Sequence, residues 1–284
     1  MIKRIAVSIG LLISASSISY ATEIQWRKLS LENTVMMTLP QGKVVIELAP
    51  QFSPNHVTQF KSLINKRFYD GEKFYRVIDG FVAQAGPTDD SDKDKSVPTL
   101  AIEEEWSTNK NWQFTPVQQN DLFAPVTGFK DGFAIGYDKK ASKAWLTHCP
   151  GVIAMARENT PNTGSSHFYI VNGQAPRYLD RIMTIFGRVV YGMNHIQAIT
   201  RTSVVEGESA VNSSEFTAIV NMQLMKNVAP EERLIVEVES TASQAFIEKL
   251  AKRKNREADF FYKKPPAVLD ICQTPVKSRL VKSS

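Results

Sequence analysis

The chain has 284 residues and a formal net charge of +5, and 43% of its residues are hydrophobic, 22% charged and 10% aromatic. This composition is typical of globular domains and excludes a disordered, collagen-like or coiled-coil chain. Two cysteines are too few for a small scaffold held by disulfides, and the four histidines lie outside any CxxC or HExxH motif, so no metal and no cofactor are expected.

The first predicted element is an export signal over residues 1–21. Lys3 and Arg4 precede an apolar run that ends near Ile18, and Ser19-Tyr20-Ala21 supplies the small residues of a cleavage site. The run is shorter than the roughly 20 apolar residues of a membrane span. We therefore expect cleavage after Ala21 and export without stable membrane insertion, into the periplasm of a Gram-negative bacterium or otherwise to the outside. An uncleaved membrane anchor is the alternative.

Removal of residues 1–21 leaves 32 basic and 29 acidic residues, a net charge of +3. The basic residues gather mainly at 249–256 and 277–282, which we read as set apart from aromatic side chains. A nucleic-acid site needs a basic stripe with rings that stack on bases. No nucleic-acid partner is therefore expected.

Two hairpins and a helix follow the signal. Pro40-Gln41-Gly42 predicts a turn between strands at 34–38 and 43–48, and Asp79-Gly80 divides residues 74–85 into two more strands. Ser53-Pro54 predicts a helix start with Ser53 as N-cap. The helix has one apolar face, which should cover a core and consists of Val57, Phe60, Leu63 and Ile64.

Residues 86–130 predict a long irregular excursion, because turn-forming residues and a charge cluster at 89–95 replace periodic runs. Further strands are expected at 132–137, 152–156, 168–171, 185–190 and 216–225, with one short helix at 192–200. Many strands with few helices indicate an antiparallel barrel or sandwich.

The character of the chain changes after residue 227. Residues 234–238 predict a strand, and Thr241-Ala242-Ser243-Gln244 is a capping box that predicts a helix to Lys254. The tail over 257–284 looks extended. Because fifty-odd residues are marginal for independent folding, we expect the extension 228–284 to pack on the barrel.

Three blocks resemble the cyclophilins, a family of peptidyl-prolyl cis-trans isomerases. Residues 71–86 read G-E-K-F-Y-R-V-I-D-G-F-V-A-Q-A-G, similar to the family signature F-H-R-V-I-x-G-F-M-x-Q-G-G. Residues 155–170 read M-A-R-E-N-T-P-N-T-G-S-S-H-F-Y-I, similar to M-A-N-x-x-P-N-T-x-G-S-Q-F-F-I. The third block has Y-L-D at 178–180, F-G-R-V at 186–189 and G-M at 192–193. The order of the blocks is also that of the family.

The resemblance implies a closed eight-stranded antiparallel barrel, capped by two helices, over residues 33–227, with an insertion at about 86–150. It implies Arg76 as the catalytic arginine and Gln84 as the residue that holds it. The implied proline pocket is lined by Phe81, Val82, Tyr169 and Leu179. The implied substrate groove contains Met155, Ala156, Arg157, His167, Tyr178 and Met183.

The chemistry implied is rotation about an X–Pro amide in polypeptide substrates. Its barrier is about 18–20 kcal/mol because the C–N bond has partial double-bond character. No bond is made or broken, so rate enhancement requires only that the twisted amide binds better than either planar form. A guanidinium, always charged and rigid, suits that stabilisation by donating to the prolyl nitrogen.

The sequence departs from the family at several of these positions. Tyr75 replaces histidine, His167 replaces glutamine, and Arg157 replaces an asparagine whose main-chain carbonyl contacts the peptide. Val82 stands for methionine, Tyr169 for phenylalanine and Met183 for a pocket histidine. Tyr178 replaces the tryptophan that contacts cyclosporin, so weak cyclosporin inhibition is expected. The Tyr169 hydroxyl must find a partner or reach water.

Two questions stay open at this point. The chain could be a non-catalytic peptide-binding or chaperone module on the same fold, although Arg76 with Gln84 favours catalysis; a small-ligand barrel would need a hollow interior. Cys149 and Cys272 either form a disulfide that ties the extension to the barrel or remain two buried free thiols. The sequence makes no prediction of oligomeric state.

Overall fold

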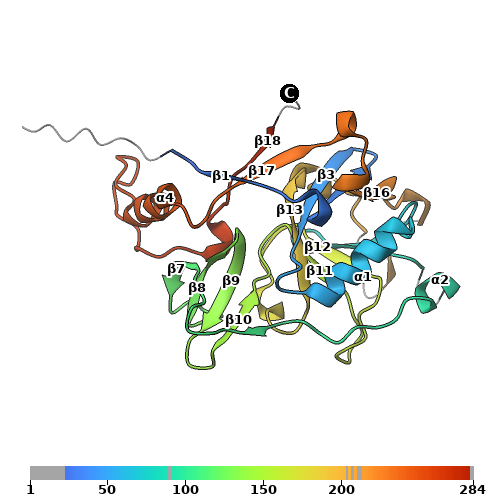
Figure 1. The fold of residues 1–284 in the computed structure, drawn as a ribbon, viewed down its shortest axis with the longest axis horizontal. Coiled ribbons are helices and arrows are strands. Elements are labelled where there is room, and N and C mark those ends of the chain that lie inside the picture. Colours follow the sequence, from blue (N-terminus) through green and yellow to red (C-terminus); the bar gives the residue numbers. More distant parts are fainter. Residues whose placement is uncertain (1–22, 89–90, 203, 206–207, 210–212, 282–284) are drawn as a thin grey trace, which may run out of the picture.

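The computed structural model describes residues 23–88, 91–202, 204–205, 208–209 and 213–281, so the expected signal segment lies outside the described residues. Strands dominate, and the molecule has two main parts (Figure 1). One part is an eight-stranded sheet with helix α1 (Pro54–Asn65) beside it. The other is a five-stranded sheet with helix α4 (Gln244–Asn255) beside it. The prediction of a mainly β fold with few helices is confirmed.

The eight-stranded sheet is antiparallel throughout and includes strands from both ends of residues 33–227, the region of the family resemblance. Its order is β16 (Asn221–Leu224), β2 (Thr34–Leu39), β3 (Gly42–Leu48), β13 (Ile185–Tyr191), β11 (Val152–Met155), β12 (Phe168–Val171), β5 (Val82–Gly86) and β4 (Lys73–Val77).

The expectation of a closed barrel is wrong in its detail, because the edge strands β16 and β4 do not pair with each other. A single bridge joins Lys73 to Ala218, and the N–H of Phe74 donates to the carbonyl of Thr217. The strand expected at 216–225 forms only from Asn221, because Ile219 and Val220 divide their hydrogen bonds between the two edges. The sheet is thus an open half-barrel whose edges meet at an irregular seam.

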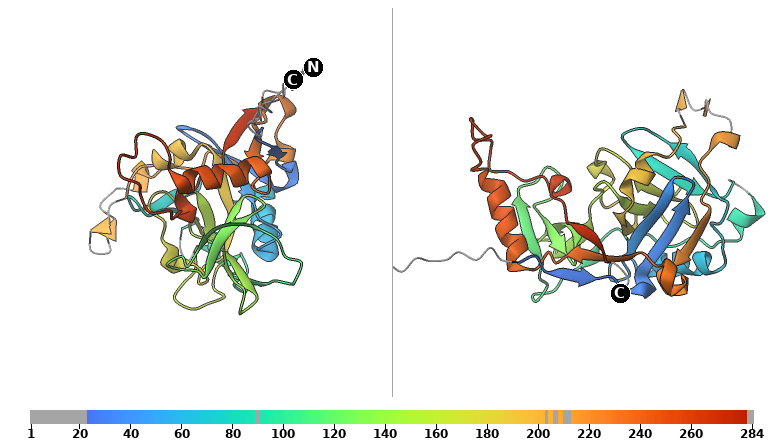
Figure 2. Two further views of the ribbon diagram at one scale, coloured as in Figure 1. Left: turned by 90° about the vertical axis from the view of Figure 1, so that its left-hand side faces the viewer. Right: turned by 90° about the horizontal axis from the view of Figure 1, so that it is seen from above.

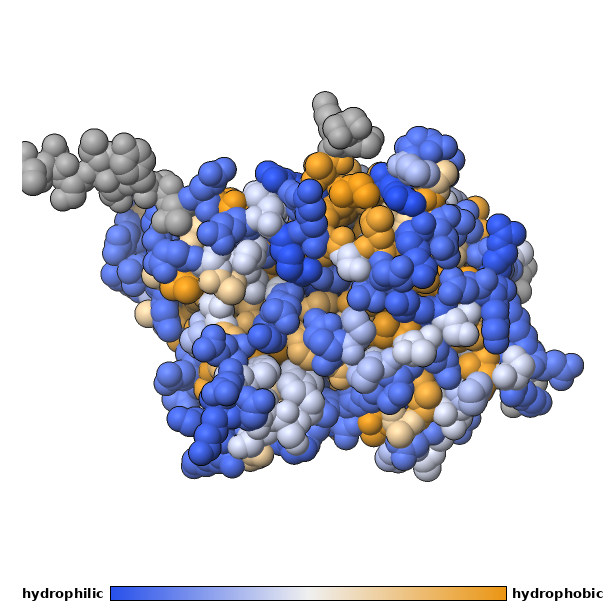
Figure 3. Space-filling model, viewed as in Figure 1, coloured by the Kyte–Doolittle hydropathy of each residue, from blue (hydrophilic) through white to orange (hydrophobic). Residues whose placement is uncertain are grey.

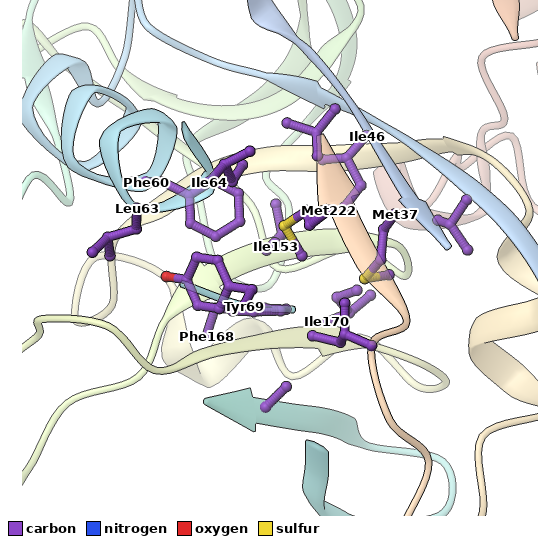
Figure 4. Close-up of a cluster of buried hydrophobic side chains, with 14 of the residues drawn as sticks. Met37, Ile46, Phe60, Leu63, Ile64, Tyr69, Ile153, Phe168, Ile170 and Met222 are labelled. Atoms are coloured by element: carbon purple, nitrogen blue, oxygen red, sulfur yellow. The ribbon is translucent and has the colours of Figure 1, made fainter. Parts of the chain in front are cut away.

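Apolar side chains fill the interior of the half-barrel (Figure 4). Phe60 of α1 contacts the rings of Tyr69 and Phe186 at centroid distances of 5.1 and 4.9 Å. The short helix α3 (Met193–Gln197) adds Ile196 to the same core. Each fully buried ring of this kind contributes about 1.5–3 kcal/mol. Because the interior is filled, the reading as a small-ligand barrel has no support.

The excursion expected over 86–130 is less irregular than the sequence predicts, because it contributes strands to a sheet that also contains the strand expected at 132–137. Residues 91–146 contain helix α2 (Asp92–Lys95) and this five-stranded antiparallel sheet. Its order is β6 (Trp106–Ser107), β10 (Lys143–Leu146), β9 (Phe133–Asp138), β8 (Val126–Lys130) and β7 (Thr115–Gln119). Gly128 and Gly136 lie within these strands, where a Cβ would meet the rings of Phe114 and Trp145 at 2.6 and 2.4 Å. The glycines therefore serve close packing, although glycine in a sequence more often indicates a turn.

The five-stranded sheet packs on the outer face of the half-barrel. We call the shared apolar group the outer cluster; its buried members are Ala49, Phe52, Val82, Phe133, Ile135, Leu146, Val152, Ala154, Tyr169, Val171 and Ile185. Side chains alternate along β11, so Ala154 joins the outer cluster while Ile153 and Met155 point into the filled interior. The insertion thus covers one outer face of the sheet.

The C-terminal extension packs on the half-barrel and also on the five-stranded sheet of the insertion. Strand β17 (Ile235–Glu239) lies between β1 (Trp26–Lys28) and β18 (Ser278–Val281), and Val238 packs with Val45 of the half-barrel. Helix α4 packs on the insertion, where the ring centroids of Phe246 and Phe129 lie 5.4 Å apart. Figure 2 shows α4 and the five-stranded sheet together at one end of the molecule.

The start of α4 differs from the predicted capping box. Ser243 is the N-cap, and its hydroxyl accepts the N–H of Phe246. Thr241 is occupied elsewhere: its hydroxyl accepts the N–H of Gly132, and its carbonyl accepts the hydroxyl of Thr115. The threonine therefore ties the extension to the insertion and leaves the cap to Ser243.

The surface view is mainly polar, with interrupted apolar groups (Figure 3). Phe260 and Tyr262 are 86% and 94% exposed and follow the basic end of α4 within a few residues. The sequence reading that set the basic residues apart from aromatic side chains was wrong here.

In the described part of the chain, no helix has both the length and the apolar character needed to cross a bilayer. The short strands β14 (Val204–Val205) and β15 (Glu208–Ser209) pair as a separate two-stranded antiparallel sheet.

Candidate functional site

Arg76 and Gln84 are cross-strand neighbours on β4 and β5. The register shifts between Phe74 and Arg76, so Tyr75 and Arg76 together oppose Gln84. Such a bulge re-aims consecutive side chains, whereas a regular strand would send them to opposite faces. The guanidinium of Arg76 donates to Oε1 of Gln84 at 3.2 Å, and Nε2 of Gln84 donates to the hydroxyl of Tyr75 at 2.7 Å.

Phe81 stands beside the arginine, with 5.9 Å between the Arg76 Cζ and the Phe81 ring centroid. The ring is half-buried at the margin of the outer cluster. Its main chain belongs to the turn that joins β4 to β5, where its N–H donates to the carbonyl of Ile78 at 3.2 Å, and its carbonyl accepts the N–H of Asn172 at 3.0 Å. A cation thus lies next to an apolar surface, as a site for a polarised proline amide requires.

Val82 and Tyr169 lie in the same outer cluster but are only 2% and 4% exposed. Phe133, Ile135 and Leu146 of the insertion pack in this cluster and close it on one side. Partly exposed members of the cluster include Phe81, Ala156 and Met183. Of the cluster residues that the resemblance assigns to the pocket and groove, these three are therefore the accessible ones, whereas Val82 and Tyr169 are almost inaccessible.

The hydroxyl of Tyr169 finds its partner in His148, a fully buried residue of the insertion. His148 Nε2 lies 2.9 Å from the Tyr169 hydroxyl, and His148 Nδ1 lies 3.0 Å from Oδ1 of Asp180. Because a carboxylate only accepts, the proton sits on Nδ1 and the tyrosine donates to Nε2. Burial raises the pKa of Tyr169 well above its usual 10.0, so the hydroxyl stays protonated.

The same contacts anchor the turn that carries Tyr178 and Leu179. This turn is the 3₁₀ helix η2 (Arg177–Leu179), and Asp180 ends it by accepting the Arg177 Nε at 2.6 Å. Leu179 is half-buried and Tyr178 is 64% exposed, and neither belongs to the outer cluster. The structure therefore places Leu179 next to the network behind the pocket and leaves it out of the apolar group itself.

Met155 does not belong to a substrate groove. Its side chain is buried in the filled interior of the half-barrel, because the alternation along β11 turns it away from Ala154. The sequence block that contains Met155 is thus correctly aligned with a strand, but this side chain faces the wrong way to touch a substrate.

Arg157 is half-buried, and its side chain stabilises the loop that follows β11. Its guanidinium donates to the carbonyl of Ile182 at 3.0 and 3.1 Å and to the carbonyl of Glu158 at 2.7 Å. The side chain thus joins the loop after β11 to the segment before Met183. The main chain of this loop remains the part that could contact a substrate.

His167 bonds to residues that the sequence did not assign to the site. Its Nδ1 lies 2.7 Å from the Tyr75 hydroxyl, and its Nε2 lies 3.2 Å from Oδ1 of Asp94 on α2. Sequence reasoning also missed His148 and the aromatic side chains of the insertion that pack in or against the outer cluster, which are Trp106, Trp112, Phe114, Phe133 and Tyr137. The one available signal was that Tyr75, His167 and Tyr169 all depart from the family pattern, which suggests compensating partners elsewhere. In the described residues, no cluster of three His, Cys, Asp or Glu could hold a metal ion.

The comparisons with known proteins agree on one family. A family model described as "Cyclophilin type peptidyl-prolyl cis-trans isomerase/CLD" matches residues 34–224. A "Probable peptidyl-prolyl cis-trans isomerase" of Brucella suis is 30% identical over 181 residues, which is 64% of this chain and 78% of that protein. "Peptidyl-prolyl cis-trans isomerase B" of Bacillus subtilis is 27% identical over 165 residues, 58% of this chain and 88% of that protein.

The crystal structure of cyclophilin AquaCyp293 from Hirschia baltica superposes with a TM-score of 0.71 at 27% identity. The match covers 91% of this chain and 94% of that one. This share is larger than the span of the family model, so the likeness extends beyond residues 34–224.

Proposed function

The chain belongs to the family of cyclophilin-type peptidyl-prolyl cis-trans isomerases, and from this premise we propose that Arg76 and Gln84 accelerate X–Pro rotation in exported polypeptides and thereby assist their folding. The observation that carries the assignment of the site is the convergence of three side chains. The Arg76 guanidinium bonds Gln84 at 3.2 Å and lies 5.9 Å from the Phe81 ring centroid.

The mechanism uses binding alone. The proline ring rests against Phe81 and the apolar residues below it, so the prolyl side of the bond is held while the carbonyl side turns. Rotation breaks the amide resonance and leaves a lone pair on the prolyl nitrogen. Arg76 donates to that nitrogen, an interaction available only near the twisted geometry. Each 1.4 kcal/mol of such selective stabilisation gives about a tenfold increase in rate.

The test compares cis-to-trans exchange of a proline tetrapeptide for the wild type and for Arg76→Ala. We expect the variant to keep its fold, measured by circular dichroism, and to lose at least about tenfold in kcat/KM. Arg253→Ala, which removes an exposed arginine of α4, is the matched control and should keep full activity. Equal turnover by the wild type and Arg76→Ala would remove Arg76 from the mechanism.

The alternative of a non-catalytic peptide-binding or chaperone module has one observation in its favour. Val82 and Tyr169 are almost closed off by the insertion, so less of the pocket is open than the sequence suggests. In this case the wild type would bind proline peptides, measured by titration calorimetry, without accelerating their isomerisation. The same assay therefore separates the two functions.

Export is part of the proposal and rests on two features. Residues 1–21 have the charged start, apolar run and small residues of a cleaved signal. Cys149 and Cys272 form a disulfide, which is typical of oxidising compartments. We expect the mature protein to begin at Thr22 and to occur in the periplasm, or outside the cell where no periplasm exists. N-terminal sequencing and cell fractionation test this, and a mature protein that retains Lys3 inside the cell would contradict it.

A further inference from the structure

A continuous line of hydrogen bonds runs from Arg76 to the insertion. Arg76 bonds Gln84 at 3.2 Å, and Gln84 bonds the Tyr75 hydroxyl at 2.7 Å. Tyr75 lies 2.7 Å from His167 Nδ1, and His167 Nε2 lies 3.2 Å from Oδ1 of Asp94. The line joins β4, β5 and β12 to the short helix α2.

With His167 in its neutral form, the chemistry of the groups gives the line one direction. The amide nitrogen of Gln84 donates to the Tyr75 oxygen, which leaves the tyrosine proton for His167 Nδ1. The proton of a neutral His167 then lies on Nε2 and points at the Asp94 carboxylate, which only accepts. Each group thus donates to the next, from the arginine to the aspartate, and every distance on the line is compatible with that order.

The far end of the line is held firmly. Asp94 Oδ1 also accepts the hydroxyl of Ser166 at 2.9 Å, and the N–H of Asp94 donates to the Ser91 hydroxyl at 3.2 Å. The ring of His167 lies against Gly86, where an added Cβ would come within 2.5 Å of Nδ1. The Asp94 carboxylate and the His167 imidazole therefore have little room to move. The Tyr75 hydroxyl thus has a hydrogen-bond partner in a fixed position.

We propose that Asp94, His167 and Tyr75 are positioning residues that hold the Gln84 amide, and through it the Arg76 guanidinium, in the orientation used for proline rotation. The proposal rests on the proposed role of Arg76. Without the tyrosine hydroxyl, the Gln84 amide has lost the partner of its nitrogen and can rotate, so its oxygen no longer fixes the guanidinium. Misplacement of a catalytic group by about 1 Å can cost up to a hundredfold in rate.

This proposal explains why Tyr75 and His167 both differ from the family pattern: the two side chains contact each other. Tyr75 and His167 are replaced together, and the hydroxyl of one meets the imidazole of the other. Asp94, which completes the arrangement, belongs to the insertion and has no counterpart in the quoted family blocks. The insertion therefore reaches the catalytic arginine as well as the apolar pocket.

The first test measures kcat and KM separately for Tyr75→Phe and Asp94→Asn. Because the arginine acts on the twisted amide, we expect kcat to fall about threefold to tenfold while KM stays within twofold. Asp92→Asn is the matched control, because it removes the same charge from an exposed position of α2 and should leave kcat unchanged. His167→Ala should behave like Tyr75→Phe, and His167→Gln should recover most of the loss, since a carboxamide can accept from Tyr75 and donate to Asp94.

The second test repeats Tyr75→Phe in an Arg76→Ala background. If the tyrosine acts through the arginine, it has no further effect there, and the two changes are strongly non-additive. The same factor of loss in both backgrounds would overturn the proposal while leaving the proposed function intact. Unchanged kcat in Tyr75→Phe and Asp94→Asn would overturn it as well. Full activity of Arg76→Ala would instead refute the proposed role of Arg76, and the positioning residues with it.

Discussion

Tyr169 illustrates at the scale of one residue how a substitution in a pocket requires a second residue elsewhere. A buried hydroxyl without a partner costs free energy, and here Nε2 of His148, in the insertion, accepts a hydrogen bond from the Tyr169 hydroxyl at 2.9 Å. Asp180 in turn fixes the His148 tautomer. The hydroxyl is thus bound within the protein, and the whole side chain is almost inaccessible.

We predict that Tyr169→Phe destabilises the protein although it restores the family's residue. The change leaves His148 Nε2 buried without a donor, which should lower the free energy of unfolding by about 1–3 kcal/mol. Urea unfolding measures the effect. Tyr178→Phe removes a hydroxyl from an exposed side chain and should stay within about 0.5 kcal/mol of the wild type. Equal stability of Tyr169→Phe and the wild type would contradict the role of His148.

Tyr178 carries a second prediction, on cyclosporin. The family's tryptophan contacts this ligand, and the smaller tyrosine ring here is 64% exposed on η2, so a larger ring has space. Tyr178→Trp should strengthen inhibition about tenfold, which corresponds to 1.4 kcal/mol of binding free energy. Tyr262→Trp on the extension is the matched control and should change nothing. Inhibition constants from the isomerase assay decide, and nanomolar inhibition of the wild type would refute the expectation of weak binding.

At the scale of elements, the insertion completes helix α1. Ser53 occupies the N-cap position as predicted, but its hydroxyl donates to the carbonyl of Ile185 and does not cap the helix. Glu103 of the insertion accepts the N–H groups of Asn55 and His56 at 3.1 and 3.0 Å instead. A carboxylate also suits the positive end of the helix dipole. The helix start therefore depends on a residue 48 positions downstream of Asn55.

This cap predicts a loss of stability in acid. Burial lowers the pKa of His56 from 6.5, although the hydrogen bond to Glu103 acts in the opposite direction. Burial would raise the pKa of Glu103, but the hydrogen bonds from His56 and Asn55 outweigh it and lower that pKa from 4.5. Since both groups bind protons more readily when unfolded, the free energy of unfolding falls as pH drops. The stability that His56 contributes is lost as the pH falls below 6.5. The stability that Glu103 contributes is lost as the pH falls from 4.5 to the pKa of Glu103 in the folded protein.

Thermal unfolding of the wild type and of Glu103→Gln between pH 7.5 and 3.5 checks the prediction. The variant should be less stable at neutral pH, because an amide caps the helix more weakly than a carboxylate. It should also lose less stability than the wild type at the acid end, where its amide does not titrate. Parallel pH curves for the two proteins would show that Glu103 does not contribute in this way.

The elements that the sequence predicts correctly have local signals that agree with one another. The strands at 34–39 and 42–48 are apolar runs on either side of a turn and lie within one residue of their expected bounds. The helix at 54–65 has one apolar face and begins at Pro54, as expected. The strands β7 and β8 were missed because Pro116 lies at a bulge and Gly128 packs against a ring, and both residue types favour turns in a sequence reading. Arg76 and Gln84 could be assigned to the proposed site from the sequence because a family motif carries them. The hydrogen bonds of Asp94 and His148 could not be predicted, because they depend on contacts across the fold that local patterns do not contain.

At the scale of the whole molecule, buried charges join the half-barrel, the insertion and the N-terminal strand. Glu47 on β3 is buried and pairs with Arg27 at 2.7 Å and with Arg188 at 2.9 Å. Arg188 also donates to the carbonyl of Gly132 in the insertion at 2.6 Å. Removal of one partner of such a group leaves an uncompensated buried charge. The insertion and the terminal strands are thus structural parts of one unit with the half-barrel.

The disulfide is the one covalent tie among the contacts described here. Cys149, next to the pocket residue His148, is bonded to Cys272 of the 3₁₀ helix η6 (Ile271–Gln273), 123 positions later in the chain. A crosslink over a loop of this length restricts the unfolded chain by about 4–5 kcal/mol in the chain-entropy account. The extension has further contacts, since Phe246 packs on Phe129 and Leu269 bonds Gln118 at 3.2 Å.

We therefore predict that loss of the disulfide loosens the extension first and the half-barrel last. The double variant Cys149→Ser/Cys272→Ser should have a lower Tm, and hydrogen exchange should accelerate in α4 before it does in β12, because the interior core does not depend on the crosslink. Dithiothreitol should produce the same change in the wild type and none in the variant. Two titratable thiols in the unreduced, denatured wild type would refute the bond itself. Uniform acceleration of exchange across α4 and β12 would show instead that the extension and the half-barrel unfold as one cooperative unit.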